Sequence, residues 1–360
     1  MKLDPTLPAS APHQGRGAAS NPPNRYAGQH TETMDDGWWQ DDLPPLKTEW
    51  LAEEAKTILA RNDSPDIPFD RSLNPYRGCE HGCIYCYARP SHAWLGLSPG
   101  LDFESRLSYK PDAARLLDAE LRQPGYACAP VMLGANTDCY QPGERRLRLT
   151  RAVLEVLHAH QHPAVIITKS ALVRRDLDLL AAMAARRQAA VWISLSSLDT
   201  TLTRQLEPRA AAPAARLQAL RELAAAGVPV GVLCAPVIPA LNDAAMENVL
   251  TAAREAGAVS AAYVVLRLPL EVRLLFREWL DIHYPHKARH VLDSVRNLHG
   301  GKEYDSSFGT RMTGRGPIAD IIGRRFAAAC KRLGLNTQEW ALDCGAFAPP
   351  AAAGDQMALF

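Results

Sequence analysis

Long apolar runs, an excess of charge of either sign and a secretion signal are all missing from this sequence. Its 360 residues carry 40 Lys and Arg against 39 Asp and Glu, a net charge of +1, and 47% of them are hydrophobic. This composition is typical of a globular protein, and it excludes a wholly disordered chain, a coiled coil and a collagen-like fibre. The length suits one large α/β barrel-type domain or two ordinary domains.

One segment, 223–241, is uncharged over roughly the length that spans a membrane. It contains glycines and prolines, and proline removes a backbone donor and kinks a helix, so we interpret it as a buried strand at 230–235 flanked by turns. No apolar signal-peptide core is visible near the N-terminus. We therefore expect a cytoplasmic protein without a membrane partner, whose reduced cysteines form no disulfide framework.

Short apolar runs alternate with helical patterns through the middle of the chain. The runs lie at 73–77, 131–134, 165–168, 191–195, 230–235 and 263–266, and the helical patterns at 147–160, 172–186, 214–226, 244–256 and 270–283. This alternation predicts α/β architecture, with βα units around a parallel sheet. Six units are too few for a closed eight-strand barrel, so a partial (βα)6 TIM-like barrel and an open doubly wound sheet are the alternatives. Both place the active site at the carboxyl ends of the strands.

Composition divides the rest of the chain. Residues 1–45, rich in Pro, Gly, Ala and Asn, predict a disordered tail, followed by an extension at 46–69 and the barrel core at 70–283. A basic helical segment at 284–340 and a flexible tail at 341–360 complete the chain. Residues 1–66 carry 6 Lys and Arg against 11 Asp and Glu, whereas residues 284–332 carry 10 against 4. The balanced total thus hides a basic segment that suits a polyanionic substrate, with a solvated helix face as the alternative explanation.

Three cysteines, Cys79, Cys83 and Cys86, form the pattern C-x3-C-x2-C in the segment NPYRGCEHGCIYCYARP. They follow the first predicted strand, and Gly78 and Gly82 allow the backbone to turn tightly around one metal centre. The other five cysteines are isolated along the chain, so we predict a single centre.

Three explanations of this cluster compete. A structural zinc site needs a fourth ligand, for which His81 and His92 are candidates. The cysteines can also be ordinary core residues. The third explanation is a [4Fe–4S] cluster, which usually takes four cysteines. With three, one iron stays open to another ligand, and an open position is typical of a catalytic centre.

The segment CEHGCIYC, with Tyr85 before its last cysteine, resembles the hallmark of the radical S-adenosylmethionine (SAM) enzymes. The longer segment NPYRGCEHGCIYCYARPSH resembles the subgroup related to spore photoproduct lyase, often labelled DNA repair photolyase-like. The resemblance covers residues 70–335 and implies one [4Fe–4S] cluster, SAM at its open iron, and an electron donor such as flavodoxin or ferredoxin. It also implies that SAM is cleaved to methionine and a 5′-deoxyadenosyl radical, which abstracts hydrogen from the substrate.

Positions after the second and third strands match residues that hold SAM in that subgroup. Thr137 and Asp138 match a Ser/Thr–Asp pair, and a hydroxyl and a carboxylate suit an ammonium group; a helix N-cap is the alternative. Lys169 looks like the family lysine that contacts the SAM carboxylate, and a solvated lysine at the rim is the alternative.

Later strands supply the other implied SAM contacts. Ser194 and Ser196 alternate along a strand, so both point to one face, near the ribose in a partial barrel. Glu207 and Arg216 match positions that approach the ribose or the carboxylate, with surface charge as the alternative. Ala235 ends the strand that packs its backbone against adenine in the family.

One departure from the subgroup concerns hydrogen transfer. Spore photoproduct lyase has a hydrogen-donating cysteine two residues before its Ser/Thr–Asp pair, where this chain has Ala135. Cys139 and Tyr140 are the alternative relay candidates, or else ordinary buried residues. Arg267, which closes the last strand, can grip an anionic substrate or form an internal salt bridge.

Three functions stay open on these observations. The first is a radical SAM enzyme that acts on nucleic acid, and the second is one that acts on a peptide or small metabolite. The third is a non-catalytic iron–sulfur or zinc protein.

Overall fold

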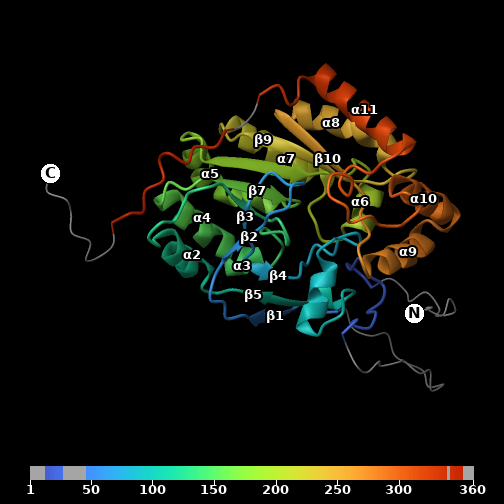
Figure 1. Ribbon diagram of the computed structural model, residues 1–360, viewed down its shortest axis with the longest axis horizontal. Helices are drawn as coiled ribbons and strands as arrows, with labels where there is room; N and C mark the ends of the chain where they lie inside the picture. The colour runs from blue at the N-terminus through green and yellow to red at the C-terminus, as the bar shows by residue number, and fades with distance from the viewer. Residues whose placement is uncertain (1–12, 27–45, 339–340, 352–360) are drawn as a thin grey trace.

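The computed structural model describes residues 13–26, 46–338 and 341–351, which build a parallel sheet flanked by helices (Figure 1). The main sheet has seven strands in the order β10-β9-β8-β7-β6-β3-β2. They are β10 (Ser260–Val265), β9 (Val230–Val237), β8 (Ala189–Ser194), β7 (Ala164–Thr168), β6 (Val131–Leu133), β3 (Arg71–Leu73) and β2 (Leu59–Arg61). Each pair from β3 to β10 is parallel, and β2 is antiparallel to β3.

The order of the parallel strands decides between the two predicted architectures. A doubly wound sheet reverses its strand order at a switch point, whereas these six strands follow one another in chain order without a reversal. Within the described ranges no ladder joins β10 to β2, so the sheet is not closed by hydrogen bonds. The doubly wound alternative is therefore wrong, and the arrangement is consistent with a partial TIM-like barrel.

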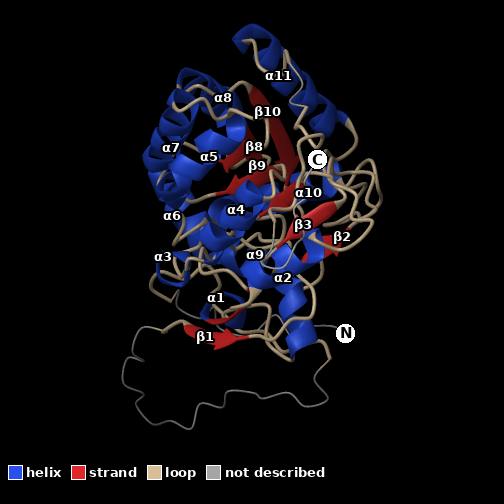
Figure 2. Cartoon of the chain, turned by 90° about the vertical axis from the view of Figure 1, so that its left-hand side faces the viewer, coloured by secondary structure: helices blue, strands red, loops and turns tan. Residues whose placement is uncertain are grey.

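Helices after each strand cover the sheet (Figure 2). They include α4 (Leu149–Ala159), α5 (Leu177–Ala184), α7 (Pro213–Ala225), α8 (Met246–Glu255) and α11 (Pro317–Leu333). One core cluster joins alternate strand residues, such as Val191 and Val232, to apolar helix positions such as Leu220 and Val249. A second cluster, around Trp279, packs α9 (Val272–His283) and α10 (Pro285–Leu298). None of the described helices is long and apolar enough to cross a membrane.

The predicted strand at 73–77 is divided between two sheets. β3 ends at Leu73, and β4 (Tyr76–Arg77) pairs antiparallel with β5 (Arg106–Tyr109) in a three-stranded sheet completed by β1 (Glu49–Ala52). Pro75 stands at the break, and proline cannot donate to a strand ladder. This change of sheet directs the chain from the main sheet into the cysteine loop.

Both predicted tails contain packed segments. Residues 16–19 and Asn24 are buried, so the expectation of disorder is wrong for this part of 1–45. At the other end, Asp343 N donates to Arg187 O at 2.8 Å, and the Phe347 ring packs against Tyr126 and His162. Residues 1–12, 27–45 and 352–360 of these tails lie outside the described ranges.

Candidate active site

The cysteine loop lies between β4 and the 3-10 helix η1 (Arg89–Leu95), close to the carboxyl end of β3. Cys79 and Cys83 are each 7% exposed, and Cys86 is partly buried beside them. Gly78 and Gly82 have φ of +73° and +66°, which confirms the tight turns predicted for both. A Cβ on Gly78 would also overlap the side chain of Leu107.

The chemistry of these thiols fits a metal centre. Burial raises the pKa of the Cys79 thiol well above its usual value and that of Cys83 to about 12, although Lys169 acts in the opposite direction on Cys83. The thiolate is the form that binds metal, so a bound metal would supply the positive charge that these buried sulfurs need.

The ligand geometry bears on which metal centre fits. Within the described ranges, no three His, Cys, Asp or Glu side chains converge as ligands of a single metal ion. A cubane cluster binds each cysteine through a different iron, so its ligands need not converge on one point. The two histidines considered for zinc contact protein atoms instead: His92 Nε2 lies 3.0 Å from Arg106 O, and His81 Nδ1 lies 3.3 Å from Asp138 Oδ2.

Asp138 links the cysteine loop to the end of β7. Its Oδ1 accepts from Thr168 Oγ1 at 2.7 Å, and its Oδ2 accepts from Lys169 N at 2.7 Å. Burial alone would raise the pKa of this carboxyl, but His81 and these hydrogen bonds hold it below its usual range. Thr137 donates through Oγ1 to Tyr76 O at 3.0 Å. Both predicted SAM contacts are therefore engaged by the protein in this structure.

Glu207 and Arg216 form a buried ion pair and are 1% and 0% exposed, so the surface-charge alternative is wrong. Arg216 also donates from Nε to Ala211 O at 2.7 Å and from Nη1 to Ser194 O at 2.9 Å. Glu207 in turn accepts from the Tyr85 hydroxyl. Burial opposes the charge on Glu207, yet Arg216 and nearby Lys169 keep its pKa below the usual value. The pair thus ties the cysteine loop to β8.

Lys169 is the predicted SAM contact that best fits a ligand role. Its Nζ lies 5.9 Å from the centroid of the Tyr85 ring. Burial alone would lower the pKa of this ammonium, but Cys83, Glu207 and Asp138 raise it above its usual value. The group therefore keeps its positive charge beside the cysteine loop.

Ser194, the last residue of β8, and Ser196 differ in what they contact. Ser194 Oγ donates to Ala235 O at 3.4 Å, which links β8 to β9. The Ser196 hydroxyl is buried and has no hydrogen-bond partner among the described residues. A buried hydroxyl without a partner is costly, so Ser196 is suited to receive a ligand.

Cys139 and Tyr140 are both fully buried in the main core cluster. The Tyr140 hydroxyl donates to Asp176 Oδ2 at 2.9 Å. These contacts account for both residues as parts of the core, and nothing in their surroundings points to hydrogen transfer.

Arg267 lies where the last strand ends, between two tyrosine rings. Its guanidinium carbon lies 5.4 Å from the Tyr87 ring centroid and 5.8 Å from that of Tyr304. Nη2 donates to the Tyr304 hydroxyl at 3.1 Å and Nη1 to Met312 Sδ at 3.3 Å. Within the described ranges Arg267 forms no salt bridge, so the internal-pair alternative finds no support there.

Sequence reasoning missed two amides that brace the site. Gln141 accepts from Glu80 N at 2.8 Å and donates to Gly78 O at 3.2 Å. Asn74 Oδ1 accepts from the backbone of Asn136 at 3.1 Å. Asn74 and Gln141 lie in the segments after β3 and β6 that contain the predicted site residues. A polar side chain in such a segment is a sequence signal that could have identified them.

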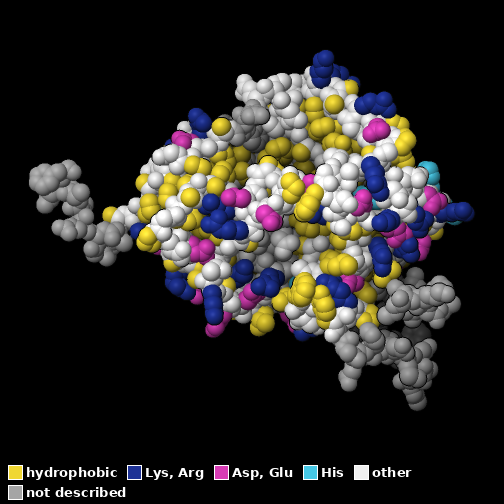
Figure 3. Space-filling model, in the orientation of Figure 1, with side chains coloured by type: hydrophobic (Ala, Val, Ile, Leu, Met, Phe, Trp, Pro, Cys, Tyr) yellow, Lys and Arg dark blue, Asp and Glu magenta, His cyan; other side chains and the backbone are white. Residues whose placement is uncertain are grey.

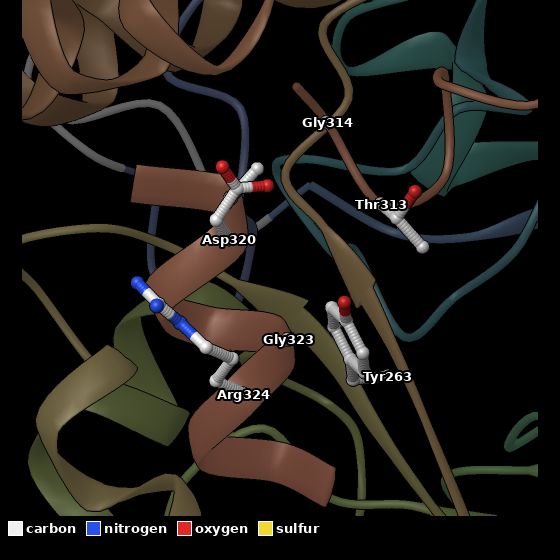
Figure 4. A pocket seen from close by; sticks show the side chains of 7 residues that line it. Tyr263, Thr313, Gly314, Asp320, Gly323 and Arg324 are labelled. Atoms are coloured by element: carbon white, nitrogen blue, oxygen red, sulfur yellow. The ribbon is translucent and has the colours of Figure 1, made fainter. Parts of the chain in front are cut away.

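A hollow of about 560 Å³ lies elsewhere, between β10 and α11 (Figure 4). Tyr263, Asp320 and Arg324 are among its lining residues, and Tyr263 packs against Phe326 with ring centroids 4.7 Å apart. None of the predicted site residues lines this hollow.

Comparisons with known proteins match the central part of the chain. A family model described as the radical SAM superfamily matches residues 73–253, half of the chain. An uncharacterized protein of Mycobacterium tuberculosis is 38% identical over 221 residues, which are 61% of this chain and 65% of that protein. The match therefore spans less than two thirds of that relative's length. An uncharacterized protein of Methanocaldococcus jannaschii is 26% identical over 59% of this chain and 76% of that protein.

Solved structures of spore photoproduct lyase resemble the fold. One mutant of that enzyme matches with a TM-score of 0.57 and 17% identity over 79% of this chain and 80% of that chain. The lyase complexed with dinucleoside spore photoproduct matches with a TM-score of 0.56 and 16% identity, with the same coverage. At this identity the likeness shows the fold alone.

Proposed function

The chain belongs to the radical SAM superfamily, and from this premise we propose that it is an enzyme with a [4Fe–4S] cluster and SAM at the carboxyl edge of the main sheet. A bound, reduced cluster would supply the one electron for reductive cleavage of SAM to methionine and a 5′-deoxyadenosyl radical, the species that would abstract hydrogen from the substrate. Cys79, Cys83 and Cys86 are the proposed cluster ligands. A low-potential donor such as flavodoxin or ferredoxin is the proposed reductant.

The position of Lys169 beside the cysteine loop is the observation that carries this proposal. Its ammonium stays charged next to Cys83 and Tyr85, which suits the carboxylate of SAM. Ser196 lies two residues after the end of β8. Its buried hydroxyl has no hydrogen-bond partner among the described residues. We therefore assign direct SAM contacts to Lys169, Ser196 and the backbone at Ala235.

The other predicted SAM contacts have a different proposed role. The side chains of Asp138, Glu207 and Arg216 are already engaged with protein atoms, and Thr137 and Ser194 donate to backbone carbonyls. We propose that these residues position the cysteine loop and the strand ends, because a ligand would have to displace contacts that they already make.

The direct test is anaerobic reconstitution followed by reduction. Wild-type protein is expected to take up about four iron atoms per chain and, with dithionite and SAM, to release 5′-deoxyadenosine. Cys83→Ala should lose the cluster, while Cys128→Ala, outside the loop, should keep it. Wild-type protein that binds no iron, or that never forms deoxyadenosine, would reject the proposal and favour a non-catalytic protein.

Nucleic acid is the substrate class that the surface favours. Exposed basic residues gather on α10 and α11, among them Lys287, Arg289, Arg324, Lys331 and Arg332 (Figure 3). The similar lyase structure with dinucleoside spore photoproduct points to the same class. The logarithm of the affinity for single- and double-stranded DNA and RNA should fall linearly with the logarithm of the salt concentration. Absence of binding at low salt would leave a peptide or small metabolite as the substrate.

A further inference from the structure

A short segment near the N-terminus packs directly against the cysteine loop. In Figure 1 it is the dark blue trace beside α9, and Ser20 Oγ donates to Glu278 on that helix at 2.6 Å. Its residues Arg16, Gly17, Ala18, Ala19 and Asn24 are buried. We infer that this N-terminal strap, residues 16–24, holds the cysteine loop in its metal-binding conformation through Glu104, a positioning residue. The inference rests on the proposed cluster.

The strap meets the loop backbone to backbone. A Cβ on Gly17 would overlap the carbonyl oxygen of Gly82, which lies between Cys79 and Cys83 in sequence. A Cβ on Gly82 would in turn lie 2.6 Å from Glu104 Oε2. Glycine is therefore required on both sides of this contact. Ala18 and Ile84 belong to the same buried cluster, so the contact also has an apolar part.

Glu104, in helix α1 (Asp102–Ser105), connects the strap to the loop. Its carboxylate accepts from Gly17 N and Ala18 N at 2.9 Å each, and it forms a buried ion pair with Arg89. Arg89 donates from Nε to Cys83 O at 2.9 Å and from Nη2 to Gly82 O at 3.1 Å. Both Glu104 and Arg89 are 0% exposed, so neither charge is screened by water if its partner is lost.

A second branch reaches the other end of the loop. Arg16 Nη2 donates to Thr48 Oγ1 at 3.0 Å, and Thr48 donates to Glu80 Oε1 at 2.8 Å, next to Cys79. Arg16 Nη1 also donates to Glu104 O at 2.6 Å. Strap contacts thus reach the Glu80 side chain next to Cys79 through Thr48, and the carbonyls of Gly82 and Cys83 through Glu104 and Arg89.

These contacts are made by protein atoms alone, so the inference is that they hold the loop without help from a metal. The carbonyls of Gly82 and Cys83 are held by Arg89, and the Cys79 and Cys83 side chains are largely covered. A pre-formed loop avoids the ordering that a flexible ligand loop undergoes on metal binding, so it retains metal more tightly. The strap is then a part of the cluster site that precedes the barrel by more than 40 residues.

The test uses full-length variants and two measurements. Gly17→Ala and Glu104→Gln change the strap contact. Gly15→Ala is the control for glycine in the same segment: Gly15 has a φ of +72°, whereas Gly17 lies outside the left-handed region, but a Cβ on Gly15 would have no neighbour within 4 Å. Glu144→Gln is the control for a buried carboxylate, because Glu144 is 0% exposed and pairs with Arg175.

In metal-free protein, labelling of Cys79 and Cys83 by a thiol reagent should be slow in the wild type and at least tenfold faster in both strap variants. After reconstitution, a chelator should bleach the cluster of these variants at least tenfold faster. The Glu104→Gln cluster should also have a more positive midpoint potential, since a negative charge has been removed nearby. The melting temperature of metal-free Glu104→Gln should fall no further than that of Glu144→Gln.

Wild-type labelling as fast at Cys79 and Cys83 as at Cys86 would overturn the inference, because the loop would not be pre-formed. Equal bleaching in strap variants, controls and wild type would overturn it too. If wild-type protein fails to bind a cluster, the proposed function fails instead. The labelling experiment on metal-free protein still measures the strap in that case.

Discussion

Replacing Arg216 by methionine removes one partner of the buried pair that joins the cysteine loop to β8. Glu207 would then keep its carboxylate at 1% exposure with the Tyr85 hydroxyl as its hydrogen-bond donor. Breaking a buried pair by removing one partner costs about 3–5 kcal/mol, because the remaining charge is uncompensated. The carbonyls of Ala211 and Ser194 also lose their donor. We expect the free energy of unfolding to fall by about 3–5 kcal/mol at pH 8.

The destabilisation caused by Arg216→Met should also depend on pH. In the wild type the pKa of Glu207 lies below its usual value, despite burial. Its ionised form therefore stabilises the fold above the unfolded pKa of about 4.3, and this stability is lost as pH falls through the folded value. In Arg216→Met, burial raises that pKa, and Lys169 offsets only part of the rise. The variant should therefore be less destabilised at pH 5 than at pH 8, by about 1.4 kcal/mol for each unit by which the folded-state pKa of Glu207 exceeds 5.

Urea denaturation of metal-free protein at both pH values measures these effects. Arg151→Met is the control, since its partners Asp178 and Glu155 are exposed and the buried Asp176, 3.5 Å away, keeps its ion pair with Arg175. It should cost less than Arg216→Met. A double variant, Glu207→Gln with Arg216→Met, should recover part of the loss because the buried charge is gone. The reasoning is refuted if Arg216→Met costs no more than Arg151→Met, or if its cost is the same at pH 5 and pH 8.

Three further substitutions probe the loop, the core and the C-terminal segment. Gly82→Ala should reduce the iron content after reconstitution, since its Cβ would press on Glu104; iron binding equal to the wild type would contradict the packing. Tyr140→Phe should lower the free energy of unfolding by about 1.5–3 kcal/mol, because the Asp176 carboxylate loses one hydrogen bond while its ion pair with Arg175 remains, and it should leave deoxyadenosine release unchanged; loss of release would restore a relay role. Phe347→Ala should increase proteolysis near residues 341–351, and an unchanged cleavage pattern would show that this ring does not anchor the segment.

The parallel strands from β6 to β10 could be predicted because each contains an apolar run with helices packed on it, whereas β3 (Arg71–Leu73) contains Arg71 and Ser72. β8 and β9, for example, are buried along nearly their whole length, so no polar alternation hides them. β1 escaped prediction because it is short and largely exposed, and β4 was predicted only as the end of a single strand at 73–77. Both pair with β5, a partner distant in sequence. The strap escaped for the same reason. Its Gly- and Ala-rich sequence has no periodicity, and its main partner, Glu104, lies 87 residues beyond Gly17.

Three pairs of opposite charge brace the cysteine loop from three sides: Arg89 with Glu104, Arg216 with Glu207, and, when the imidazole is protonated, His81 with Asp138. A buried ion pair often adds little stability over an apolar one, so stability alone does not explain their concentration here. An ion pair carries no net charge, yet its fixed dipole and its hydrogen bonds hold the loop in one geometry. The charge that a ligand would meet then comes from Lys169 and the three cysteines, which is the arrangement that a SAM carboxylate and an iron–sulfur cluster require.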